Sequence, residues 1–201
     1  MNEIVDWGVA SRALAGEPVS GDLHLVATFD QGALAAVIDG LGHGPEAAEA
    51  ARAAAAVLSR RSDAPVGDLV QLCHQELRQT RGVAMSLASF NARSNVMTWV
   101  GVGDVEGVLA PAVGAAERSP QWILLRSGIV GYRLPPLREA ALPVAPGDTL
   151  IFATDGVHPR FDSDDGTRRS PQEIADDILA RLGKFTDDAL ALVVRYWGAA
   201  P

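Results

Sequence analysis

Two apolar segments joined by a short turn are the clearest pattern in the first quarter of the chain. They cover residues 22–29 and 32–39, and the turn between them contains glycine. A connection of this kind closes a β-hairpin. Antiparallel pairing brings the start of the first strand beside the end of the second. The pattern therefore predicts that Asp22 and Asp39 lie next to each other.

The rest of the chain alternates between helical and strand periodicity. Gly44-Pro45-Glu46 has the residues of a helix start, and the alanine-rich helix that follows is expected to end near Arg61. Period-2 alternation over residues 84–109, with a turn near 92–95, indicates a second hairpin. Further helices are predicted at 66–81 and 171–182, and further strands at 122–126, 149–154 and 189–196. These elements predict an α+β fold in which two antiparallel sheets pack together with helices outside.

Composition narrows the class of protein. A chain of 201 residues with 48% hydrophobic residues is expected to form one domain, residues 1–201. The net charge of −8, without a run of Lys or Arg, argues against a nucleic-acid partner. No segment has the length of a membrane span and the start does not resemble a signal peptide, so we expect a cytoplasmic protein with no membrane partner. The single cysteine, Cys73, excludes an internal disulfide.

Four aspartates stand at the ends of predicted strands and indicate the chemistry. They are Asp22, Asp39, Asp155 and Asp187. Carboxylates at strand ends are held at the rim of a sheet, and several that converge repel one another unless a cation neutralises them. Oxygen ligands of this kind suit Mg²⁺ or Mn²⁺. The pattern favours metal-dependent phosphoryl chemistry. The alternative for the turn after Asp39, taken alone, is a glycine-rich connection that Asp39 caps.

The order of these motifs resembles a known enzyme family. Gly21-Asp22, then Asp39-Gly40-x-Gly-His-Gly, then Thr154-Asp155-Gly, then Asp187-Asp188 before an apolar strand is similar to the metal-dependent serine/threonine phosphatases of the protein phosphatase 2C class. The chain resembles their bacterial sporulation and stress-response branch, and it has the length of the stand-alone stressosome phosphatases. The resemblance spans nearly the whole chain.

The resemblance implies an α-β-β-α sandwich of two antiparallel sheets flanked by helices, with two Mn²⁺ or Mg²⁺ ions. Asp39 would be the catalytic residue that bridges both ions and the attacking water. Asp22 and the Gly40 carbonyl would serve one ion, and Asp155 and Asp187 the other. Asp188 stays open as an alternative to Asp187, since the two are adjacent.

Three further residues keep both a functional and a structural interpretation, and one segment has an expected role. His43 could act as a general acid or shape the turn, and Arg12 could contact phosphate or lie in solvent. Asp104 could contact a metal or the substrate, or shape its glycine-rich turn. Residues 159–170 are expected to form a charged flap near Asp155.

The implied function is a phosphoserine or phosphothreonine protein phosphatase. Its substrate would be a phosphorylated scaffold or anti-sigma-antagonist protein of a bacterial stress-signalling complex, the stressosome. The alternative is a non-catalytic phosphoprotein-binding module with the same fold, and a phosphatase of small metabolites is a third possibility.

Overall fold

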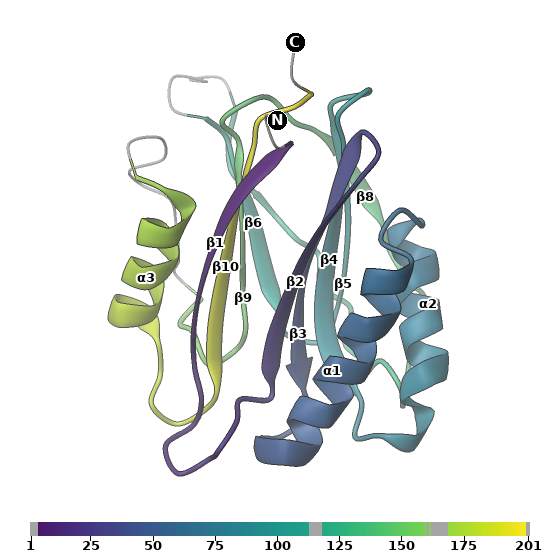
Figure 1. The fold of residues 1–201 in the computed structure, drawn as a ribbon, viewed down its shortest axis with the longest axis vertical. Helices are drawn as coiled ribbons and strands as arrows, with labels where there is room; N and C mark the ends of the chain where they lie inside the picture. The colour runs from purple at the N-terminus through teal and green to yellow at the C-terminus, as the bar shows by residue number, and fades with distance from the viewer. Residues whose placement is uncertain (1–3, 113–117, 160, 162–168, 200–201) are drawn as a thin grey trace.

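Two antiparallel sheets stack face to face in the computed structural model, which describes residues 4–112, 118–159, 161 and 169–199 (Figure 1). The first sheet has the order β1-β10-β9-β6-β7, and the second has the order β2-β3-β4-β5-β8. The strands are β1 (Val5–Arg12), β2 (Asp22–Phe29), β3 (Gly32–Gly40), β4 (Val83–Asn91), β5 (Val96–Val102), β6 (Glu106–Ala110), β7 (Gln121–Trp122), β8 (Ala140–Pro143), β9 (Thr149–Ala153) and β10 (Ala189–Tyr196).

Helices cover the outer face of each sheet (Figure 1). Helices α1 (Gly44–Arg60) and α2 (Val66–Glu76) lie on the second sheet, and α3 (Pro171–Leu182) packs on β1 and β10 of the first. A short 3₁₀ turn, η1 (Leu77–Gln79), follows α2. The layers are helix, sheet, sheet, helix, so the predicted α-β-β-α sandwich is confirmed.

Each interface between layers has its own apolar core. Phe90, Phe152 and Tyr196 lie between the two sheets, and the rings of Phe90 and Tyr196 stack at 5.6 Å. Strand β10 is buried along its whole length. A central strand with a second sheet on one side and a helix on the other has two buried faces, which explains why its sequence is a nearly continuous apolar run.

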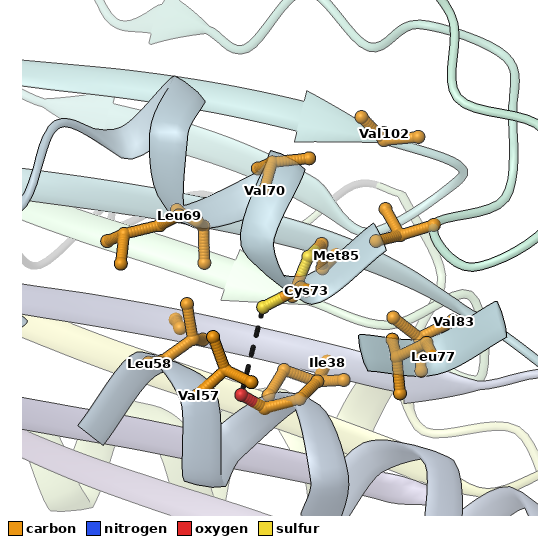
Figure 2. Close-up of a cluster of buried hydrophobic side chains, with 14 of the residues drawn as sticks. Ile38, Val57, Leu58, Leu69, Val70, Cys73, Leu77, Val83, Met85 and Val102 are labelled. Carbon is orange, nitrogen blue, oxygen red and sulfur yellow. Dashed lines mark hydrogen bonds between the residues drawn. The ribbon is translucent and has the colours of Figure 1, made fainter. Parts of the chain in front are cut away.

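The core between the second sheet and its helices contains Cys73 (Figure 2). Its side chain is fully buried beside Leu69, Val70 and Leu77, and Sγ donates to the Ala54 carbonyl at 3.8 Å. Helix α2 therefore packs an apolar face that includes Cys73 into this core.

Some element boundaries differ from the prediction. Helix α2 ends at Glu76 rather than Arg81, because the last turn tightens into η1 before Gly82 takes a positive φ. The strand predicted at 122–126 is only β7, because the chain leaves the first sheet and reaches the second through a bridge from Arg126 to Val102.

The predicted hairpin over 84–109 ends with β5 at Val102, and β6 is a separate strand that pairs with β9 in the first sheet. Strands β1 and β8 were not predicted, and both lie at sheet edges, where apolar patterning is weak. Within the described ranges, no helix combines the length and apolarity needed to cross a membrane.

Candidate metal centre

Asp22 and Asp39 are direct partners across the β2–β3 hairpin. The register places the first residue of β2 opposite the penultimate residue of β3. Asp22 is 7% exposed and Asp39 is half-buried. The prediction that the two carboxylates lie side by side is confirmed.

Gly40 lies where α1 approaches the end of β3. A Cβ atom at this position would overlap main-chain atoms of Ala47 in the first turn of the helix. The Gly40 amide donates to the Gly21 carbonyl at 3.1 Å. Glycine is therefore required here by close packing, and that packing holds the end of β3 against the residue that precedes Asp22.

Thr154 connects the two sheets at this end of the molecule. It follows β9, and its hydroxyl donates to Oδ2 of Asp22 at 2.8 Å while accepting from the Leu190 amide at 2.9 Å. The hydroxyl is buried, so both bonds form out of water. This role of Thr154 was not predicted, and its one signal in the sequence is its place directly before Asp155.

Asp155 lies at the turn that follows Thr154 and is exposed. The turn is held close to the start of β10, because a Cβ on Gly156 would overlap the main-chain carbonyl of Asp188. The Lys184 amide also donates to the Gly156 carbonyl at 2.7 Å. These contacts bring Asp155 and Asp187, the two other predicted ligands, to the same end of the two sheets.

Asp187 and Asp188 have different environments. Both carboxylate oxygens of Asp188 accept main-chain bonds, from the Leu14 and Gly21 amides at 2.7 Å each, and the residue is 3% exposed. Asp187 is half-buried, and its Oδ1 accepts from the Asp188 amide at 2.9 Å. Asp188 therefore anchors the segment before β2, and this favours Asp187 as the ligand.

The carboxylates act on one another electrostatically. Burial raises the pKa of Asp39 to about 9, and Asp22 and Asp104 are the next largest causes. Burial also raises the pKa of Asp22 to about 7; the Thr154 hydrogen bond opposes this increase, and Asp188, Asp155 and Asp187 add to it. The pKa of Asp155 is raised by burial and by Asp104 and Asp187. Such crowding of negative charge is relieved by a bound cation.

The residues present suit a divalent cation by their chemistry. Carboxylates and a main-chain carbonyl are hard oxygen donors, which Mg²⁺ and Mn²⁺ prefer. Among the residues that the structure describes, no three His, Cys, Asp or Glu side chains are already placed to hold a metal ion. The fit of this site to a divalent cation therefore rests on its oxygen donors and on the negative potential that the carboxylates share. The set of metal ligands stays a prediction.

Three other candidates are placed by the structure. His43 precedes α1, and its Nδ1 lies 2.6 Å from Oε1 of Glu17. Arg12 donates to the Lys184 carbonyl at 2.5 Å and lies over the Phe185 ring at 4.2 Å. Asp104 is exposed and contributes to the raised pKa of Asp39 and Asp155.

The contacts of His43 and Arg12 bear on the two interpretations that the sequence left open for each residue. The His43 contact ties the β1–β2 connection to the start of α1, which favours a structural role for His43. Arg12 is engaged with the segment before β10. Of the predicted charged flap, residues 160 and 162–168 lie outside the described residues.

Comparisons with known proteins agree with this architecture. A model of the SpoIIE family, stage II sporulation protein E, matches residues 30–197. The phosphoserine phosphatase RsbX of Bacillus subtilis (strain 168) is 24% identical over 188 residues, which cover 93% of this chain and 92% of RsbX.

Solved structures show the same fold. A chain described as "The bacterial stressosome: a modular system that has been adapted to control secondary messenger signaling" has a TM-score of 0.88 and 31% identity, over 96% of this chain and 100% of that one. RsbX in complex with magnesium has a TM-score of 0.85 and 21% identity, over 98% of this chain and 97% of that one. The protein phosphatase 2C domain of SpoIIE from Bacillus subtilis, solved with a fragment of its regulatory domain, has a TM-score of 0.75 and 21% identity, over 98% of this chain and 64% of that one.

The family match covers most of the chain, and the two-sheet fold is that of the solved structures. The chain therefore belongs to the SpoIIE family and is a protein serine/threonine phosphatase of the protein phosphatase 2C class.

Proposed function

We propose that this phosphatase removes phosphate from phosphoserine or phosphothreonine in a stressosome-type scaffold or anti-sigma-antagonist protein, with two Mn²⁺ or Mg²⁺ ions bound. The observation that carries the proposal is the buried, paired Asp22 and Asp39, whose pKa values the surrounding carboxylates raise further. The substrate class is supported by the similarity to a phosphoserine phosphatase and to a stressosome structure.

The ions would be held by oxygen atoms at the ends of four strands. Asp39 would hold both ions, Asp22 and the Gly40 carbonyl would hold one of them, and Asp155 and Asp187 would hold the other. Bound ions of this kind supply Lewis acidity, which neutralises phosphoryl oxygens and activates water for attack on phosphorus.

The protein's own contribution is to fix the carboxylates before substrate arrives. Thr154 orients Oδ2 of Asp22 from the opposite sheet. Asp188 holds the Gly21 amide and thereby the backbone that presents Asp22. Groups that are already oriented lose little freedom during the reaction, so their charge is fully effective at the reacting phosphate.

A covalent thiol mechanism does not fit the chain. Burial raises the pKa of Cys73 to about 12, so the side chain stays a neutral thiol near pH 7. It lies in the core under α1 and α2, and its Sγ contacts the Ala54 carbonyl (Figure 2). The only cysteine is therefore a core residue.

Hydrolysis with and without metal tests the proposal. We expect the purified protein to hydrolyse para-nitrophenyl phosphate with Mn²⁺ and to lose this activity with a chelator. Intact mass spectrometry of a phosphorylated scaffold protein from the same organism should show loss of one phosphate. Binding of that phosphoprotein without any loss of mass would instead support the non-catalytic module.

A further inference from the structure

Lys184 is the only lysine among the 17 lysine and arginine residues of the chain. It lies beside the candidate metal centre, three residues before Asp187. Its Nζ donates to the main-chain carbonyl of Asp155 at 2.5 Å. Its positive charge also opposes the increases in the pKa values of Asp155 and Glu106.

The Lys184 side chain lines a cavity of about 160 Å³ next to Asp155. Asp104 and Glu106 contribute polar atoms to the wall, and Val157 and Phe161 contribute apolar ones. This volume is well below the roughly 300–1,000 Å³ of pockets for drug-sized ligands. It suits a phosphoryl group and the side chain that carries it.

The Lys184 side chain is not needed to hold its own segment in place. The Lys184 amide already donates to the Gly156 carbonyl, and Arg12 donates to the Lys184 carbonyl. Val157 and Gly183 form a further main-chain bridge. An ammonium group has three N–H donors, and the Asp155 carbonyl accepts one of them.

We propose that Lys184 is a substrate-binding residue whose ammonium group contacts the phosphoryl oxygens of the substrate in this cavity. The inference rests on the proposed function, because it assigns part of the substrate to the same site. A phosphate dianion that approaches a group of carboxylates meets a repulsive potential, and a nearby cation reduces that repulsion. Lysine suits this role as a compact point charge with rotatable donors.

Steady-state kinetics of Lys184→Met test the proposal. At saturating Mn²⁺, we expect the KM for para-nitrophenyl phosphate and the inhibition constant of inorganic phosphate to rise about tenfold or more, which corresponds to one charge-assisted contact. The increase in melting temperature on adding Mn²⁺ should not shrink, because the variant removes a positive charge beside Asp155 and no candidate ligand. Lys184→Arg should recover part of the affinity, because it restores the charge.

Arg181→Met is the matched control. It also removes one positive charge, but Arg181 lies on α3, is largely exposed and pairs with Asp177 at 2.9 Å. We expect its KM and its phosphate inhibition to equal those of the wild type. An equal effect in both variants would show a general charge effect and would overturn the assignment.

The single lysine also gives a readout that does not need catalysis. After reductive methylation with ¹³C-formaldehyde, the Lys184 signal is identified by its absence in labelled Lys184→Arg. In the presence of Mg²⁺, added inorganic phosphate should shift this signal with saturation. If Lys184→Met fails to fold, this titration of the wild type decides the matter.

The two proposals fail in different ways. An active wild type whose Lys184→Met variant keeps its KM and phosphate inhibition overturns the role of Lys184 and leaves the proposed function intact. A wild type without metal-dependent hydrolysis contradicts the proposed function. In that case, a Lys184 signal that does not shift when phosphate is added overturns the inference as well. A shift that saturates with phosphate concentration supports it.

Discussion

Asp22 and Asp39 lie where negative charge is costly to maintain. Both are shielded from water, and neighbouring carboxylates raise the cost of ionising each of them, Asp22 among those that act on Asp39. Removing a carboxylate from water is unfavourable unless a cation or hydrogen bonds compensate for the lost hydration. The pair therefore lowers the stability of the metal-free fold, and this cost is typical of a binding site.

Asp39→Asn tests the central carboxylate. The change keeps the volume and removes the charge, so we expect the metal-dependent rate to fall by about 100-fold or more, beyond the 10–100-fold typical of residues that only support a ligand. The metal-free variant should be at least as stable as the wild type in urea at neutral pH, because wild-type Asp39 must take up a proton on folding and asparagine needs none.

Asp30→Asn is the matched control for this substitution. Asp30 lies in the turn of the same hairpin, and its side chain is 86% exposed. Its activity should equal that of the wild type. An Asp39→Asn protein with near wild-type turnover would contradict the proposed metal centre.

Asp187 and Asp188 should respond differently to the same substitution. Asp187→Asn should reduce the gain in melting temperature on adding Mn²⁺, because a ligand charge is lost. Asp188→Asn should instead destabilise the protein by about 1–3 kcal/mol. The side-chain NH₂ of asparagine would replace one of the two oxygens that accept from the Leu14 and Gly21 amides, and that amide would lose its acceptor. Thermal-shift titrations of both variants measure the two effects, and a metal response lost only in the Asp188 variant would reverse the assignment.

At the scale of elements, the centre joins strand ends from both sheets. Asp22 and Asp39 come from the second sheet, and Asp155 follows β9 of the first. Thr154 bonds to Asp22 across this interface, between residues 132 positions apart in sequence. The relative position of the two sheets thus fixes the spacing of the carboxylates.

Thr154→Val tests this connection. Valine has a similar shape but lacks the hydroxyl, so Oδ2 of Asp22 and the Leu190 amide lose their partner. We expect a loss of about 10–100-fold in metal affinity or activity, as for other residues that orient a ligand. Thr154→Ser keeps the hydroxyl and should retain most of the activity. Equal metal affinity in the valine variant and the wild type would show that Thr154 does not orient Asp22.

The sequence predicted the parts of the site that depend on local pairing. The β2–β3 hairpin is short, so its pattern fixes the register and places Asp22 opposite Asp39. The bonds of Asp188 to Leu14 and Gly21 were not predictable, because they span more than 160 residues and depend on how the sheets stack. The cavity at Lys184 was not predictable either, because residues far apart in sequence line it. Edge strand β8 was missed because four residues carry little periodic signal.

At the scale of the whole molecule, metal binding and stability should be linked. The protein has a net charge of −8, and part of that charge is concentrated at one end of the two sheets. A cation that binds only the folded state stabilises it, and the gain grows with the logarithm of concentration above the dissociation constant. Mn²⁺ or Mg²⁺ should therefore raise the melting temperature.

The pH dependence of the chelator-treated protein gives the sharpest test of this linkage. The pKa of Asp39 rises from 3.8 to about 9 in the folded state, and that of Asp22 from 3.8 to about 7. Between these values the folded protein binds more protons than the unfolded chain, so raising the pH lowers its stability. The contribution is fully present below pH 3.8 and is lost as the pH rises through about 7 and then about 9.

Urea unfolding between pH 5 and 9, with chelator and with saturating Mg²⁺, measures this loss. We expect the free energy of unfolding to fall with pH in chelator and to fall less with Mg²⁺, because the bound ion favours the ionised carboxylates. Asp39→Asn removes one titrating group, so its metal-free curve should be flatter than that of the wild type. Parallel curves for the two proteins would show that Asp39 is not protonated in the folded state. The repulsion between the carboxylates would then be too weak to raise the pKa of Asp39.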